Sequence, residues 1–423
     1  MRGTEPGTPA AAPDQAGLRA LDWLNFFVAN LQTGFGPFIA VYLTTDKWTQ
    51  GQIGVALSVG SAVGILGQVP AGLLVDALRQ KRVAAAFALG GIAAAAGMLA
   101  LWPARLPVLL AQVVHGFAGC VLYPAIAAIT LNRVGRRAYA ERLGRNARFA
   151  AMGNAAGAAV MGLIGSYLSS RTVFWFAAAL CVPALAAVWG MPPRDPPHDP
   201  ELAAAIEAPG DRRGPAWRVV LDRRVLAFAL CIVCFHLANT AMLPVAAAEV
   251  TRQAGDAANL VIAAALVVPQ LVVALLSPLV GRLAERRGRR LVLLAGFLAL
   301  PVRGLLFATL ASPALIVAVQ VLDGVGGAVI GVLVPLVAAD LTRGTGRFNL
   351  CMGTIGLAVG VGATLSTAIA GDLAGRFGSS IAFLALTLAG AVGVLTVALA
   401  MPETRPEAAA GALRRRWRPS PAE

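Results

Sequence analysis

The stretch from Gly281 to Arg290 reads GRLAERRGRR and lies between two long apolar stretches. A related stretch, GLLVDALRQKR, runs from Gly72 to Arg82 and is also flanked by apolar sequence. Each places an acidic residue four positions after its glycine and follows the acid with basic residues. Short basic joints between apolar segments are typical of the cytoplasmic loops of multi-span membrane proteins. The two stretches therefore predict a helical membrane protein whose halves are related.

Composition favours the same class of protein. Apolar residues make up 58% of the 423 residues and charged residues 13%, whereas soluble domains carry roughly 25% charged residues. A stretch of about 18 apolar residues is long enough to cross a bilayer. We therefore expect an all-α membrane protein with twelve transmembrane helices. The predicted spans are 21–43, 51–75, 83–102, 107–131, 147–168, 172–191, 224–246, 258–280, 291–311, 313–339, 349–371 and 380–400.

The basic residues sort to one side of these spans. Of the 35 Lys and Arg residues, 29 fall in the termini and alternate loops and 5 in the remaining loops. The positive-inside rule then predicts a multi-pass protein of the cell inner membrane with both termini in the cytoplasm. This pattern accounts for the net charge of +14 without a nucleic-acid partner. Residues 1–20 contain no apolar run before a cleavage site, so no removable signal peptide is predicted.

Internal similarity relates the two halves of the chain. Residues 25–30 (NFFVAN) in the first span match residues 234–239 (CFHLAN) in the seventh, and His115-Gly116 matches Asp323-Gly324. Paired bundles of this kind are a feature of secondary transporters. The predicted organisation is an N-terminal tail (1–20), a six-helix bundle (21–191), a proline-rich cytoplasmic linker (192–223), a second, pseudo-symmetric six-helix bundle (224–401) and a basic cytoplasmic tail (402–423).

The stretch 281–290 resembles the loop signature Gly-x-x-x-Asp-Arg-x-Gly-Arg-Arg of the major facilitator superfamily, with Glu285 in place of Asp. The stretch 72–82 keeps the glycine and the acid but lacks the central glycine and the arginine after the acid. A purely topogenic basic loop would explain the arginines but not the repeated spacing from glycine to acid. The resemblance implies the major facilitator fold and a loop that latches one bundle to the other.

Through the same resemblance, Asp76 is expected near the start of the eleventh span and Glu285 near the start of the fifth, with Arg148 and Arg347 as their partners. The implied gating residues are Gly72, Asp76, Arg82, Gly281, Glu285, Arg286, Gly288, Arg289, Arg290, Arg148 and Arg347.

The fifth span bears on the direction of transport. Residues 153–162 (GNAAGAAVMG) resemble the exporter motif Gly-x-x-x-Gly-Pro-x-x-Gly-Gly, with Ala158 and Met161 as departures. Such spacing also serves ordinary helix packing in membranes. Gln112 stands where exporters of the drug/proton antiporter subgroup carry an arginine, and Asp22 at the start of the first span is expected to be an interfacial cap. Proton-coupled export of a small organic compound is the leading hypothesis, and uptake of a small metabolite or organic anion by a symporter is the alternative.

Ionisable residues deep within spans are functional candidates, because each is costly unless it faces a cavity or a partner. The proton-coupling candidates are Asp323, His236, His115 and Arg303. In the superfamily the first, fourth, seventh and tenth helices line the cavity, which implies the cavity candidates Asn25, Asn30, Gln32, Gln112, Asn239 and Gln320. Arg303 is expected to point inward toward Asp323. The pair is either structural or is broken during coupling, and a tight pair would leave the two histidines as proton carriers.

Other kinds of site receive no support from the sequence. The five cysteines all fall within spans, and Cys231 and Cys234 have no second pair at metal-binding spacing. No metal, cofactor or catalytic cluster is expected, so the chain is not expected to be an enzyme. The expected partners are a small-molecule substrate, protons and the lipid bilayer, with the protein acting as a monomer.

Overall fold

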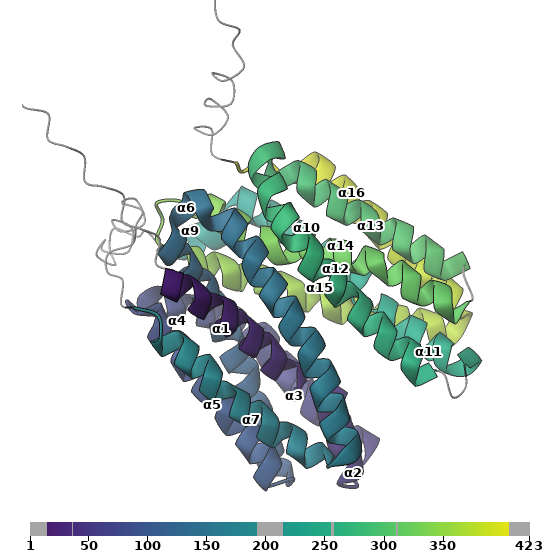
Figure 1. The fold of residues 1–423 in the computed structure, drawn as a ribbon. Helices are drawn as coiled ribbons and strands as arrows, with labels where there is room; N and C mark the ends of the chain where they lie inside the picture. The colour runs from purple at the N-terminus through teal and green to yellow at the C-terminus, as the bar shows by residue number, and fades with distance from the viewer. Residues whose placement is uncertain (1–14, 36, 193–214, 255–257, 310–311, 406–423) are drawn as a thin grey trace, which may run out of the picture.

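The computed structural model describes residues 15–35, 37–192, 215–254, 258–309 and 312–405. Most of the predicted linker and both outer tail segments therefore lie outside the described residues. The part that is described is helical throughout, in two bundles that lie side by side (Figure 1). The first bundle contains α1 (Gln15–Thr33), α2 (Pro37–Thr45), α3 (Gln50–Leu66), α4 (Gln68–Ala77), α5 (Lys81–Leu101), α6 (Arg105–Tyr167) and α7 (Ser170–Trp189). The second contains α9 (Trp217–Val220), α10 (Arg223–Asn239), α11 (Met242–Ala254), α12 (Ala258–Arg287), α13 (Arg289–Thr309), α14 (Pro313–Leu341), α15 (Phe348–Phe377) and α16 (Ser379–Ala400).

The described helices make twelve membrane crossings. Ten helical segments are long and apolar enough to span a bilayer, and α3 with α4, bent by 48°, makes an eleventh. One of these segments, α6, has 63 residues. At ~1.5 Å per residue a straight helix of that length would be about three times as long as a bilayer core is thick. Gly135, with φ of 66°, breaks α6 into the predicted fourth and fifth spans.

The joint between these two spans is helical where the sequence predicted a loop. Residues 132–146 continue the two parts of α6 beyond the predicted spans on either side of Gly135. Their arginines are compatible with helix, since arginine has a high helical propensity. A residue with a positive φ favours glycine, which explains why the break falls at this position.

The first and seventh spans are each broken at equivalent places. Helix α1 ends at Thr33 and α2 begins at Pro37, while α10 ends at Asn239 and α11 begins at Met242. A proline stands at the start of each second piece, Pro37 in α2 and Pro244 in α11. Proline cannot donate the backbone hydrogen bond that a continuous helix would need. The breaks fall beside the predicted cavity residues in both halves.

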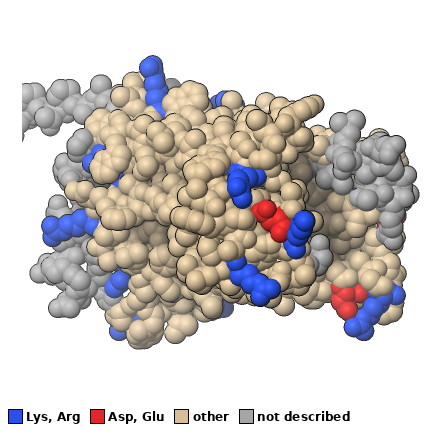
Figure 2. Space-filling view, turned by 90° about the horizontal axis from the view of Figure 1, so that it is seen from below, with Lys and Arg blue, Asp and Glu red and all other residues tan. Residues whose placement is uncertain are grey.

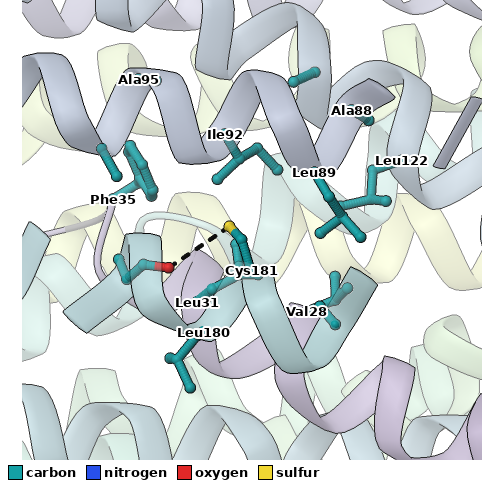
Figure 3. Close-up of a cluster of buried hydrophobic side chains, with 14 of the residues drawn as sticks. Val28, Leu31, Phe35, Ala88, Leu89, Ile92, Ala95, Leu122, Leu180 and Cys181 are labelled. Carbon is teal, nitrogen blue, oxygen red and sulfur yellow. Dashed lines mark hydrogen bonds between the residues drawn. The ribbon is translucent and has the colours of Figure 1, made fainter. Parts of the chain in front are cut away.

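The core of the first bundle consists of small and branched apolar side chains (Figure 3). Val28 and Leu31 of α1 belong to the same buried cluster as Leu89 and Ile92 of α5. Cys181 of α7 lies in this cluster, and its thiol donates to the carbonyl of Ala177. The second bundle has its own buried cluster. Large leucines such as Leu275, Leu388 and Leu399 instead lie on the outside, and the face in Figure 2 is mostly uncharged. This distribution suits a bundle that is solvated by lipid.

Candidate transport pathway and gate

The two bundles meet at two seams near the end of the molecule that carries residues 78–82, 132–148 and 282–290, here called the basic end. At the α4–α15 seam, a Cβ atom on Gly72 would lie under 3.0 Å from the backbone of Asn349, and one on Gly353 equally close to the backbone of Gln68. At the α6–α12 seam, a Cβ atom on Gly281 would lie under 3.0 Å from the backbone of Ala140, and one on Gly144 under 3.0 Å from the backbone of Ser277. Only glycine allows helices to approach so closely. The basic end is therefore closed by backbone-to-backbone contact.

Asp76 fastens the α4–α15 seam. Its carboxylate accepts hydrogen bonds from the backbone N–H of Asn349 at 3.0 Å and of Leu350 at 2.9 Å, and from the Asn349 side chain at 2.8 Å. These groups lie in the first turn of α15, which confirms the predicted place of Asp76 near the start of the eleventh span. An anion at a helix N-terminus is stabilised by the unpaired N–H groups and the helix dipole. Arg347 precedes this turn as the N-cap residue.

Glu285 does not repeat this arrangement. Its carboxylate pairs at 3.0 Å with Arg289 of its own loop. The predicted partner Arg148 instead donates from Nε to the carbonyl of Ala274 at 2.9 Å, across the α6–α12 seam. The expected pair of Glu285 with Arg148 is therefore wrong, although Gly281 of the same signature does meet the start of the fifth span. The cause is local: the chain turns at Gly288, between the end of α12 and the start of α13, and brings Arg289 back to Glu285.

The 281–290 loop is tied to the segment that follows the last span. Glu403 accepts from the backbone N–H groups of Arg289 at 2.9 Å and Arg290 at 3.2 Å, and so caps α13. Gly288 has φ of 97°, and a Cβ there would overlap Glu403. Arg405 donates to the carbonyl of Arg286 at 2.9 Å. The described residues of the predicted tail thus form a strap, 402–405, over this loop, which explains the second glycine of the signature.

Other basic residues of the predicted gating loops also contact neighbouring helices. Arg289 forms an ion pair with the carboxylate of Asp340 of α14 at 3.0 Å. Arg290 donates to the carbonyl of Ala398, and Arg82 donates to the carbonyl of Met191 at 2.6 Å. Each contact ties a basic-end loop to the end of a neighbouring helix. Asp340 and Glu403 were missed by sequence reasoning, because neither belongs to a signature stretch.

A central cavity of about 420 Å³ lies between the bundles. Asn25, Tyr123, Asn146, Asn154, His236 and Gln270 supply its polar groups. The remaining lining residues are apolar or glycine, and none of the lining residues is charged. Asn154 of α6 donates to Gln270 of α12 at 3.3 Å, which links the two bundles across it. Of the predicted residues, Asn25 and His236 reach this cavity.

A second cavity of about 540 Å³ lies within the first bundle and shares Tyr123 with the central one. It collects three predicted residues, Gln32, Gln112 and His115. His115 Nε2 lies 2.8 Å from Gln32 Oε1, and the Phe35 ring stacks on the imidazole at 3.8 Å. The structure therefore separates the two predicted histidines, His115 in this cavity and His236 between the bundles.

Arg303 is the centre of a buried polar cluster in the second bundle. Its guanidinium is 2.8 Å from the Asp323 carboxylate and donates to Asn239 at 2.5 Å and Gln320 at 2.6 Å. Gln320 in turn donates to the carbonyl of Ala265 at 2.8 Å, as Gln112 does to Ala56 in the first bundle. The predicted pair of Arg303 with Asp323 is confirmed. None of these four residues is among those that line the central cavity.

Asp22 is not the interfacial cap that its place in the sequence predicted. Helix α1 begins at Gln15, and Asp22 lies inside it, 2% exposed. Its carboxylate pairs with Arg142 at 2.7 Å and Arg145 at 2.6 Å, both on α6. Arg142 also donates to Asn146 at 2.8 Å. This network links the basic end to a residue of the central cavity.

The exporter-like stretch packs against α1. A Cβ on Gly153 would overlap the backbone of Phe26, and one on Gly157 would lie under 3.0 Å from Asn30. Asn30 is therefore buried in this contact rather than in either cavity, and its Oδ1 has no hydrogen-bond partner among the described residues. Asn154, between the two glycines, faces the central cavity. The stretch thus combines close packing on one side with a cavity residue on the other.

Comparison with known proteins supports a transporter. The chain is 35% identical over 403 residues to an uncharacterized MFS-type transporter of Mycobacterium tuberculosis (strain CDC 1551 / Oshkosh), and the match covers 94% of this chain and 96% of the relative. An uncharacterized MFS-type transporter of strain ATCC 25618 / H37Rv matches with the same identity and coverage.

Solved structures show the same fold at low sequence identity. The human organic anion transporter MFSD10 (TETRAN) superposes with a TM-score of 0.70 at 15% identity, covering 91% of this chain and 100% of that one. The major facilitator transporter FucP, in the outward conformation, gives a TM-score of 0.72 at 15% identity and covers 91% of this chain and 98% of its own. These likenesses confirm the all-α fold of two six-helix bundles.

A family model described as the Major Facilitator Superfamily matches residues 21–252 and 228–422. The two matches together cover both bundles, in agreement with the internal repeat. Since relatives over nearly the whole chain are transporters of the same type, the chain belongs to the Major Facilitator Superfamily and is a membrane transporter rather than an enzyme.

Proposed function

We propose that the chain is a proton-coupled exporter of a small organic compound, which binds in the central cavity between the bundles. The observation that carries the proposal is the position of this cavity, which both bundles line and which lies behind a basic end closed by the glycine seams and Asp76. Separating the seams and closing the opposite end would expose the same site to the other side. Such rocking about a site between two repeats is how transporters of this architecture work.

The lining of the cavity favours a neutral or anionic substrate. Its volume of about 420 Å³ falls within the range of pockets that bind drug-sized molecules. The lining contains amide, phenol and imidazole groups but no carboxylate to attract a cation. An amphipathic compound with a few hydrogen-bonding groups fits this chemistry better than a dicationic one.

His236 is the favoured proton carrier. The partly exposed Asp323 and the buried Asp22 are both held by arginines at hydrogen-bond distance. His236 instead lines the central cavity, where protonation and substrate binding can influence each other directly. Histidine changes its charge in the physiological range of pH. Asp323 becomes the carrier if the substrate breaks its pair with Arg303.

Export is favoured over uptake by the stretch 153–162, which resembles the exporter motif and places Asn154 at the cavity. The alternative is proton-coupled uptake of a small metabolite or organic anion. Its support is the absence of carboxylates in the cavity lining, which suits an anion as well as a neutral compound. One relative in fold is an organic anion transporter, but that likeness concerns the fold alone.

The test is a substrate screen in oriented proteoliposomes with an imposed pH gradient. A panel of neutral and anionic compounds is offered on each side, and proton flux is followed with a trapped pH-sensitive dye. Export predicts that a compound offered at the basic end drives proton movement in the opposite direction, whereas symport predicts movement in the same direction. Compounds that move without any proton flux would rule out coupling.

The coupling residue is identified in the same assay. We expect His236→Gln to lose accumulation against a gradient while downhill exchange of the substrate continues. His115→Gln is measured in parallel, because His115 lies in the other cavity. If His115→Gln alone loses accumulation, the proton carrier lies in the first bundle and the role of His236 is withdrawn.

A further inference from the structure

The α6–α12 seam has a basic hollow that is separate from the central cavity. It has a volume of about 390 Å³ and is lined by Arg142, Arg145 and Arg148 of α6, Arg282 and Pro278 of α12 and Leu18 of α1. None of these residues lines the central cavity. The hollow, here called the arginine hollow, is therefore a separate site at the basic end, shared between the two bundles.

The hollow carries an excess of positive charge. Four arginines line it, against a single acidic lining residue, Glu141. Asp22 neutralises part of this charge through its pairs with Arg142 and Arg145. Among the described residues, the four arginines are therefore balanced by two acids, Glu141 and Asp22, which leaves a net charge of about +2 at the hollow. Arg148 and Arg282 are both exposed. Arg148 uses Nε on the carbonyl of Ala274, which leaves its two terminal NH2 groups, together with the guanidinium of Arg282, for a ligand.

The surface next to the hollow is suited to lipid chains. On α12, Leu275, Leu279 and Arg282 follow one another at helical spacing, so they lie on one face, and the two leucines are 71% and 51% exposed. On α1, Trp23 is 52% exposed and packs edge-on to Phe149 at 6.4 Å. Arg145 lies over the Phe149 ring at 5.8 Å. Exposed tryptophan is typical of the interface between lipid and water.

We propose that the arginine hollow binds the phosphate of an anionic phospholipid headgroup, with an acyl chain along Leu279 and Leu275. Arginine forms paired hydrogen bonds with phosphate oxygens, and basic pockets between membrane helices recognise anionic lipid headgroups. Three of the arginines belong to the first bundle and Arg282 to the second. A bound lipid therefore bridges the α6–α12 seam and favours the state in which the basic end is closed.

The test is lipid binding to the full-length protein in detergent, measured by native mass spectrometry. Phosphatidylglycerol is titrated, and phosphatidylcholine of the same chain length is the zwitterionic comparison. The variant Arg148→Gln with Arg282→Gln leaves the Asp22 pairs intact. We expect it to bind phosphatidylglycerol about 30-fold more weakly, since each arginine near a membrane surface contributes roughly a fivefold factor. Phosphatidylcholine binding should change little.

The matched control is Arg223→Gln with Arg224→Gln, which removes two exposed arginines at the start of α10, outside the hollow. Its affinity for phosphatidylglycerol should stay within about twofold of the wild type. An equal loss in both pairs, or none in either, overturns the proposal. If the double variant of the hollow does not fold, Arg282→Gln alone, at an exposed position, should still weaken binding about fivefold.

Inorganic phosphate distinguishes a lipid site from a site for a free anion. It is added during the phosphatidylglycerol titration and also offered alone. We expect millimolar phosphate to displace little lipid, because the acyl contacts contribute to binding. Full displacement by phosphate, or phosphate binding that depends on Arg148 and Arg282 to the same extent, would show a free-anion site and reject the lipid.

Discussion

Asp323 and Arg303 form an ion pair, and the loss of either residue would leave the charge of the other uncompensated. Arg303 is 1% exposed, and Asp323 is its only acidic partner among the described residues. Asn239 and Gln320 can hold the guanidinium but cannot neutralise it. Removing one member of a buried ion pair costs ~3 to 5 kcal/mol, because the other charge is left uncompensated.

We therefore expect Asp323→Asn to reduce the yield of folded protein strongly, and the double variant with Arg303→Gln to recover it. Folded yield is measured by size-exclusion chromatography of detergent extracts. If Asp323→Asn folds normally and loses only gradient-driven accumulation, the pair is a coupling element. In that case Asp323 replaces His236 as the proposed proton carrier.

Asp76 and Glu285 occupy equivalent positions but hold different partners, which predicts unequal mutants. Asp76→Ala removes an anion from the start of α15, and such an interaction contributes up to about 2 kcal/mol when partly buried. We expect the closed basic end to lose stability by a factor of about 30 and transport to slow, with folded yield unchanged.

Glu285→Ala serves as the comparison for that measurement. It loses a partly exposed pair within one loop, and such pairs are worth little. Substrate exchange in proteoliposomes should therefore fall less for Glu285→Ala than for Asp76→Ala. Equal rates for both variants and the wild type would leave these loops with a topogenic role alone.

At the level of single residues, sequence reasoning found the ionisable groups inside the spans but misjudged those at the span edges. The apolar run that begins at Leu21 predicts a cap at Asp22, yet the helix extends back to Gln15. Hydropathy likewise places Arg142 and Arg145 in a loop, whereas both lie in α6. Hydropathy indicates which residues lie in the lipid, but helices continue beyond the bilayer core. Ion pairs between these helix extensions, such as that of Asp22 with Arg142, are therefore not predicted from hydropathy.

At the level of the helices, the glycines at the seams between the bundles predict the effect of adding a methyl group there. Gly72→Ala or Gly353→Ala would place a methyl group against backbone that cannot move without separating α4 from α15. Overpacking of this kind costs typically 1 to 3 kcal/mol. We expect these variants to fold, to favour the open basic end and to slow transport.

The control for the seam variants is Gly90→Ala or Gly97→Ala in α5, where a new Cβ meets nothing within 4 Å. These changes should leave transport unaltered and raise helix stability slightly, because alanine is the better helix former. The opening of the basic end is followed by the distance between spin labels on either side of the seam. A seam variant that behaves like Gly90→Ala would contradict the close-approach account.

Spans could be predicted as elements, but their interruptions could not. The first and seventh spans are predicted as single helices, whereas the structure breaks each of them near a proline, Pro37 and Pro244. The separation of the fourth and fifth spans was predicted, but its position at Gly135 was not, because a chain rich in glycine offers many such positions. Only tertiary contact decides which glycine adopts a positive φ, and here the two parts of α6 pack against different neighbours.

For the whole molecule, the distribution of charge predicts the topology. Reporters fused after Arg290 and after Glu423 should both report the cytoplasm, because 29 basic residues fall on that side and 5 on the other. Paired phosphatase and fluorescent reporters give the measurement. A periplasmic signal at either site would show that the number of crossings or the orientation is wrong.

The overall architecture was predictable because it depends on features that can be read along the chain, namely the lengths of the apolar stretches, the positions of the basic residues and the similarity of the two halves. The sites depend on which helix faces meet, and two similar halves do not reveal this. His115 and Asp323 align in sequence, yet one stacks on Phe35 and the other pairs with Arg303. Pseudo-symmetry therefore predicts positions well and partners poorly.

The strap at Glu403 has a consequence for the order of biosynthesis. The N–H groups that it caps belong to Arg289 and Arg290, which leave the ribosome more than a hundred residues before the cap itself. During that interval four spans, from α13 to α16, must insert while the start of α13 is uncapped. The second signature loop therefore takes its final form only after all of these spans have been synthesised. A nascent chain that stops short of Glu403 carries every crossing but an unfinished gate.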